Sequence, residues 1–112
     1  MDTNNALESF AALSQDTRLA VFRLLVREEP EGLPAGEIAR RLSVPHNTLS
    51  AHLAILARAG WLTSTRHGRT IIYRANLAHM EQLIMFLAND CCAGHPDMCR
   101  SLMIRLDETH EQ

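Results

Sequence analysis

Apolar residues recur at intervals of three and four along most of the chain, and this spacing predicts amphipathic helices. Turn-forming residues such as Pro34 and Gly60 interrupt the pattern and mark where helices begin or end. Five helices are expected, over about residues 7–13, 16–28, 34–42, 46–59 and 77–89. A further short helix is expected around Leu102 to Leu106.

Two stretches follow a different pattern. Trp61–Arg66 and Thr70–Arg74 are rich in β-branched and aromatic residues and are joined by the sequence HGR, so they predict a β-hairpin. The fold is therefore expected to be mainly α with a small β-hairpin (α+β), in a single domain over residues 1–112. A loop is expected at 90–100, after the last long helix.

The two faces of the fourth predicted helix differ in chemistry. Leu49, Leu53 and Leu56 share a narrow arc and are expected to be buried. Small and hydrogen-bonding side chains let a helix backbone descend into the major groove of DNA. The opposite face carries mostly residues of this kind: Asn47, Ala51, Ala54 and Arg58, flanked by Ser50.

The composition is that of an ordinary soluble domain, with 46% hydrophobic and 21% charged residues in 112. No apolar run approaches the ~20 residues that span a bilayer, and the start MDTNNALESF lacks the basic-then-apolar order of a secretory signal. We therefore expect a cytoplasmic protein without membrane association. An enzyme is not expected, because the chain has no phosphate-cradling glycine loop and no cysteine placed at a helix start.

Charge is strongly segregated along the chain. Residues 1–37 carry three arginines and seven acidic residues, and residues 81–112 carry two arginines and six acidic residues. A positive surface is expected of a protein that meets phosphate, although a solvated basic face or an acidic protein partner also fits the charge alone. The span 38–80 contains no acid and six arginines: Arg40, Arg41, Arg58, Arg66, Arg69 and Arg74.

Three motifs resemble the winged helix-turn-helix repressors of the ArsR/SmtB type. They are ALSQDTRLAVFRLL in the second helix, EIARRLSVPHNTLSAHLAILARAGWL across the helix-turn-helix, and RHGRTIIYR in the hairpin, or wing. The resemblance covers about residues 7–88. It implies a homodimer joined mainly through its first and last helices. Such a repressor binds an imperfect inverted repeat of double-stranded DNA and leaves it when an inducer binds.

The resemblance makes residues 46–53 the start of the DNA-reading helix. For His52, which matches the family motif, a structural role and a phosphate contact are equally compatible with its position. If about four arginines per subunit met phosphates, log K would fall against log salt with a slope of about −7. The expected DNA contacts come from the reading helix and the wing: His46, Asn47, Thr48, Ser50, Ala51, Arg66, His67 and Arg69.

All three cysteines lie close together in the stretch NDCCAGHPDMC, as Cys91, Cys92 and Cys99. In a reducing compartment, such a cluster favours a metal site or redox chemistry over a structural disulfide. Two inducer sites of the family do not fit this chain. One uses cysteines in the third helix, but the matching stretch here reads GLPAGEIA and contains no cysteine. The other is a zinc-binding pattern on the last helix. When that pattern is aligned at His79, its other ligand positions are lost or substituted. The three thiols resemble the carboxyl-terminal site of arsenite-responsive repressors, which implies release by trivalent arsenic or antimony.

The donor chemistry of the thiols is compatible with more than one inducer. Soft thiolates select soft ions, and trivalent arsenic or antimony needs only three sulfurs. Zinc or cadmium would want a fourth ligand, which His95 could supply. A thiol-redox response is a further alternative, in which a bridge from the adjacent pair to Cys99 would be less strained than one within the pair.

Overall fold

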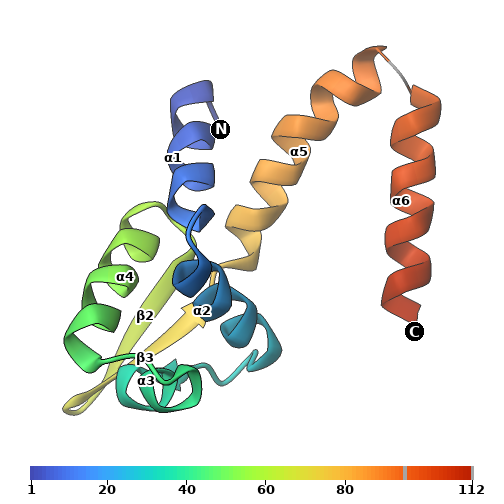
Figure 1. The fold of residues 1–112 in the computed structure, drawn as a ribbon. Helices are drawn as coiled ribbons and strands as arrows, with labels where there is room; N and C mark the ends of the chain where they lie inside the picture. Colours follow the sequence, from blue (N-terminus) through green and yellow to red (C-terminus); the bar gives the residue numbers. More distant parts are fainter. Residues whose placement is uncertain (95, 112) are drawn as a thin grey trace.

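The computed structural model describes the backbone of residues 1–94 and 96–111 (Figure 1), and the side chains of residues 1–89, 96–98, 100–102, 104 and 105. Six helices and three short strands follow one another in this described part of the chain. The mainly α fold with a small β-hairpin is therefore confirmed. The elements are α1 Thr3–Leu13, α2 Asp16–Arg27, β1 Leu33–Pro34, α3 Ala35–Leu42, α4 His46–Arg58, β2 Leu62–His67, β3 Thr70–Ala75, α5 Leu77–Gly94 and α6 Pro96–Glu111.

Local chemistry fixes one end of each of the helices α1, α3 and α4. The Asp2 carboxylate accepts a hydrogen bond from the backbone N–H of Asn5 at 2.8 Å and caps α1. The α3 helix ends at Ser43, whose left-handed φ of 54° turns the chain toward α4. The α4 helix ends just before Gly60, whose φ of 96° suits glycine. These two left-handed positions set the helix-turn-helix angle and the entry into β2.

The core lies where α2, α3 and α4 pack over the sheet. Leu49 and Leu56 are 0% exposed and Leu53 is 2% exposed, so the predicted inward face of the reading helix is confirmed. Trp61, at the start of the hairpin, is also buried. Burial of each large apolar side chain contributes about 1.5–3 kcal/mol, and this packing holds α4 in place.

The sheet contains one strand that the sequence pattern does not predict. The strands are antiparallel in the order β1-β3-β2, with Leu33 opposite Tyr73 and Leu62 opposite Ala75. β1 has only two residues, one of them Pro34, and so gives no alternating pattern. Gly32 precedes it because a Cβ there would lie 2.4 Å from the carbonyl oxygen of Tyr73.

The loop expected at 90–100 is wrong. The α5 helix continues through both adjacent cysteines to Gly94, and α6 starts at Pro96 and runs to Glu111, well beyond the short helix expected there. The reason is that no helix-breaking residue occurs between Leu77 and Gly94, while proline is well tolerated at a helix start. Figure 1 shows α5 rising away from the sheet and α6 running back in the opposite direction.

The apolar stripes of α1 and α5 point largely away from the core. The buried face of α1 is formed by Ala6, Ser9 and Ala12. Exposed apolar side chains cover the outer faces of both helices: Leu7, Phe10, Ile84, Met85 and Leu87. None of the helices in the described part of the chain is long and apolar enough to cross a membrane.

Candidate nucleic-acid interface and thiol cluster

The first two turns of α4 present a polar, exposed surface. The helix starts after Pro45, which has no side-chain cap, and its apolar face is held in the core. The hydroxyl of Ser50 donates to the carbonyl of His46 at 3.1 Å, so its lone pairs stay available to accept. The amide NH2 group of Asn47 is likewise available to contact a base edge. All five predicted contacts of this helix are exposed: His46, Asn47, Thr48, Ser50 and Ala51.

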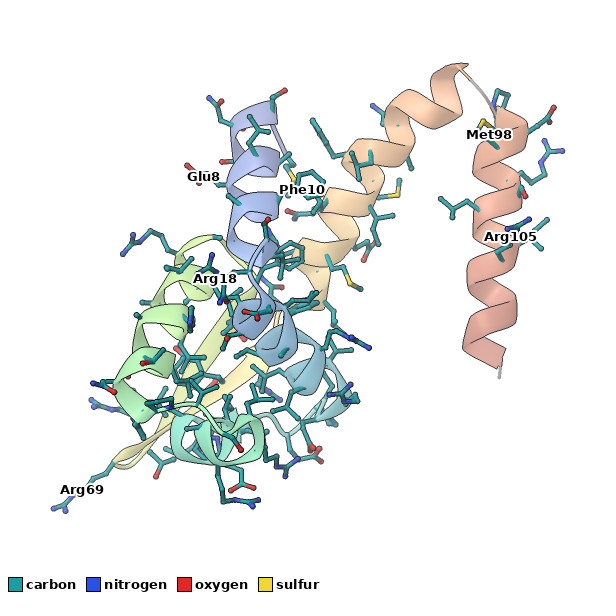
Figure 2. The ribbon with its side chains drawn as sticks, viewed as in Figure 1. Glu8, Phe10, Arg18, Arg69, Met98 and Arg105 are labelled. Atoms are coloured by element: carbon teal, nitrogen blue, oxygen red, sulfur yellow. The ribbon has the colours of Figure 1, made fainter. Side chains whose placement is uncertain are left out.

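The wing places the other three predicted contacts at the end of the hairpin. Arg66 lies opposite Ile71 and His67 opposite Thr70, and the turn passes through Gly68 with a φ of 62°. Arg69 projects from the tip into solvent (Figure 2). The guanidinium groups of Arg66 and Arg69 make no hydrogen bond or ion pair with the described residues, so they are available to phosphates.

Two arginines of the acid-free span are held by carboxylates just outside it. Arg40 and Arg41 both pair with Glu37, and Arg41 also pairs with Glu28. Hydrogen bonds from Arg40 and then Arg41 lower the pKa of Glu37 from 4.5 to about 2 and raise the pKa of both arginines. The signal for this was present in the sequence, because Glu37 precedes the two arginines by three and four positions.

Two further basic residues near the interface have structural partners. Arg74 donates from Nε to the carbonyl of Pro30 at 2.7 Å, which ties the hairpin to the segment before β1. Arg18 donates from Nε to the carbonyl of Ala12 at 2.6 Å, and its Nη1 lies 3.3 Å from Nδ1 of His52. His52 is half-buried and joins α4 to α2 through this contact.

The three cysteines belong to the backbone of the last two helices. The backbone of Cys91 and Cys92 belongs to the last turns of α5, and that of Cys99 to the first turn of α6. The side chains of these cysteines, and residue His95, lie outside the described part of the structure, so the predicted three-sulfur site stays a prediction. Among the side chains that are described, no three potential metal ligands cluster.

His79, which could have begun a zinc pattern, faces the interior instead. Its Nε2 lies 2.8 Å from the hydroxyl oxygen of the fully buried Ser9, and its ring meets that of Trp61 edge-on at 4.8 Å between centroids. Burial lowers the pKa of His79. Sequence reasoning missed this cluster because Ser9 and His79 are 70 positions apart in the chain and only the packing of α1 against α5 brings them together.

Comparison with known proteins points to transcription regulators. The family model of a helix-turn-helix domain matches residues 13–65. The transcriptional activator HlyU of Vibrio cholerae is 28% identical over 84 residues, which cover 75% of each chain. The transcriptional repressor SmtB of Mycobacterium tuberculosis is 33% identical over 78 residues, which cover 70% of this chain and 56% of SmtB.

A solved structure shares the whole architecture. An ArsR-like transcriptional regulator from Rhodococcus sp. RHA1 superposes with a TM-score of 0.73 and 27% identity, over 90% of this chain and 92% of the other. These similarities support DNA-binding regulation and agree with the expectation that the chain is not an enzyme. Because one relative is an activator and another a repressor, they leave the direction of regulation open.

Proposed function

The chain belongs to the ArsR/SmtB family of winged helix-turn-helix regulators, and on that premise we propose that it is a repressor released from DNA by trivalent arsenic bound to its three cysteines. The observation that carries the proposal is the position of the thiols. Cys91 and Cys92 lie in the last turn of α5 and Cys99 in the first turn of α6, so three soft donors are carried by neighbouring ends of two successive helices.

The DNA-binding half of the proposal rests on the exposed faces of α4 and the wing. The polar first turns of α4 suit the major groove, and Arg66 and Arg69 suit phosphates beside it. In a two-fold symmetric dimer, two such helices would read half-sites about 34 Å apart, which requires an inverted repeat.

Dimerisation is supported by the apolar surface of α1 and α5. Leu7 is 60% exposed and Phe10 43%, although both are large apolar side chains on a well-formed helix. Met85 and Leu87 add to this surface from α5. Contiguous exposed apolar patches of this kind mark interaction sites, and the family resemblance identifies the partner as a second copy of the chain.

The inducer follows from the donor set. Three thiolates complete the coordination of trivalent arsenic or antimony, whereas zinc and cadmium favour a fourth ligand. Closing three sulfurs around one ion would fix the angle between α5 and α6. Since α5 contributes to the proposed dimer surface, the ion would change the separation of the two reading helices. Such coupling typically amounts to ~1–3 kcal/mol, or about 5- to 150-fold in DNA affinity.

The DNA-binding half is tested with a duplex that the protein itself selects from a random pool. The selected sequence should contain an inverted repeat, and binding measured by fluorescence anisotropy should weaken when Asn47 or Arg69 is changed to alanine. A protein that selects no sequence, or one that binds equally well with both residues replaced, would contradict the assignment of the reading helix and wing.

The inducer half is tested by adding arsenite to the complex with that selected duplex. Wild-type protein should release the DNA, while Cys91→Ser, Cys92→Ser and Cys99→Ser should bind it normally and fail to release it. Met98→Ala, which changes an exposed residue beside Cys99, serves as the matched control. If zinc, cadmium or an oxidant released the DNA and arsenite did not, the inducer would be that agent and not arsenic.

A further inference from the structure

A hydrogen bond between the buried Ser9 and the partly buried His79 joins α1 to α5. Ser9 is 0% exposed and the hydrogen of its hydroxyl goes to the carbonyl of Asn5 at 2.9 Å. The same oxygen lies 2.8 Å from Nε2 of His79, and with its own hydrogen directed to Asn5 it accepts from an imidazole that carries its hydrogen on Nε2. The neutral ring therefore keeps Nδ1 unprotonated.

The same two residues also hold the end of the reading helix. The indole N–H of Trp61 donates to the carbonyl of Ser9 at 2.8 Å, and the Trp61 ring contacts His79 edge-on. A Cβ on Gly60 would lie 2.8 Å from the His79 ring, so the backbone after α4 passes directly over the imidazole. Asn76, just before α5, donates to the carbonyl of Gly60 at 2.9 Å.

We propose that His79 is a positioning residue that transmits movement of α5 to α1 and to the end of the reading helix. A shift of α5 carries the imidazole with it. The ring then either pulls Ser9 and the Trp61 segment along or leaves a buried hydroxyl with an unsatisfied lone pair, which is costly. The inference rests on the proposed function, because it describes how a change at the cysteine end of α5 reaches the DNA-binding surface.

The charged groups around His79 are compatible with a neutral ring. A surface hollow of about 240 Å³ reaches His79 and is lined by Glu8 from α1, Arg58 from α4 and Gln82 from α5, among others. The carboxylate of Glu8 would favour an imidazolium and the guanidinium of Arg58 would oppose it. Burial disfavours the charged ring as well and lowers the pKa of His79.

The first test measures the affinity for the selected duplex, with and without arsenite, in variants of Ser9 and His79. Ser9→Ala and His79→Leu should keep the affinity without inducer, while the 5- to 150-fold loss on adding arsenite should shrink to less than about 3-fold. His79→Gln can still donate from its amide and should restore most of the response. Ser14→Ala, an exposed serine at the end of the same helix, should behave as wild type. Full arsenite response in Ser9→Ala and His79→Leu would overturn the inference.

The second test uses Trp61, the only tryptophan in the sequence, and needs no inducer. If His79 links α5 to the reading helix, binding of the selected duplex should change the Trp61 emission in wild type and Ser14→Ala but not in His79→Leu, which removes the ring that contacts Trp61. An emission that DNA does not alter, or alters equally in all three proteins, would overturn the inference. A wild type that responds to DNA but not to arsenite would instead disprove only the proposed inducer.

Discussion

The Nε atom of Arg41 lies 3.0 Å from a carboxylate oxygen of Glu37, one helical turn earlier on α3. Arg40 donates to the other oxygen of the same carboxylate, also at 3.0 Å from Nε. Two of the six arginines in the acid-free span are therefore largely neutralised before any DNA arrives. Arg66 and Arg69, in the wing beside the reading helix, make no ion pair with the described residues and are the arginines we expect to contact phosphates.

This pairing changes the expected salt dependence of DNA binding. With two wing arginines in each of two subunits, about four phosphates are neutralised, so log K should fall against log salt with a slope of about −4 instead of about −7. Fluorescence anisotropy with the selected duplex over a salt series measures this slope. Arg69→Ala should reduce its magnitude by about 2, while Arg40→Ala should leave it unchanged. A wild-type slope near −7 would mean that about two more arginines per subunit contact phosphates, and Arg40→Ala would then show whether Arg40 is one of them.

The Glu37 carboxylate should make the free energy of unfolding depend on pH in the acidic range. Because the pKa of Glu37 falls from 4.5 to about 2 on folding, its contribution is present above pH 4.5 and is lost as the pH falls toward 2. Glu37→Gln should therefore unfold at lower denaturant concentration than wild type at pH 7. The two proteins should converge near pH 2. The difference at pH 7 will be small, since the group is exposed and screened by solvent. Urea titrations at several pH values provide the measurement, and parallel curves at all pH values would contradict it.

The sequence predicts the reading helix well because its pattern is local. Leu49, Leu53 and Leu56 repeat at helical spacing, and all three are buried as that spacing requires. β1 could not be predicted, because two residues cannot show an alternation and Leu33 becomes a strand only by pairing with Tyr73, forty positions later. The sequence pattern predicts the end of α5 near residue 89, but the helix continues to Gly94 because no helix-breaking residue comes earlier.

The parts of the candidate site that depend on local pattern could be predicted from the sequence, and the long-range contacts could not. Residues 46–51 and the wing tip lie on exposed elements whose positions follow from local pattern. The contact of His52 with Arg18 and that of His79 with Ser9 depend on how distant helices pack, and no spacing in the chain encodes either. For both histidines, only the fold distinguishes a structural partner from an available ligand.

The two left-handed glycines of the DNA-binding region should differ in their tolerance to alanine. Gly68 has a φ of 62° and nothing within 4 Å of an added Cβ, so Gly68→Ala should cost only about 1–2 kcal/mol of backbone strain. At Gly60, a Cβ would also meet the His79 ring at 2.8 Å, which adds about 1–3 kcal/mol of overpacking. Urea unfolding of both variants tests the difference. Equal costs would show that the imidazole moves aside freely.

The partly buried imidazole of His79 should also make stability depend on pH near neutrality. Since burial lowers the pKa of His79 below its ordinary 6.5, the unfolded chain binds more protons than the folded one as the pH falls below about 6.5. The free energy of unfolding should therefore decrease from pH 7.5 to pH 5.5, and His79→Gln should remove most of that decrease. Urea unfolding followed by Trp61 emission supplies the measurement, because Trp61 touches the titrating ring. Equal pH dependence in wild type and His79→Gln would mean that another group, not this histidine, is titrating over the range.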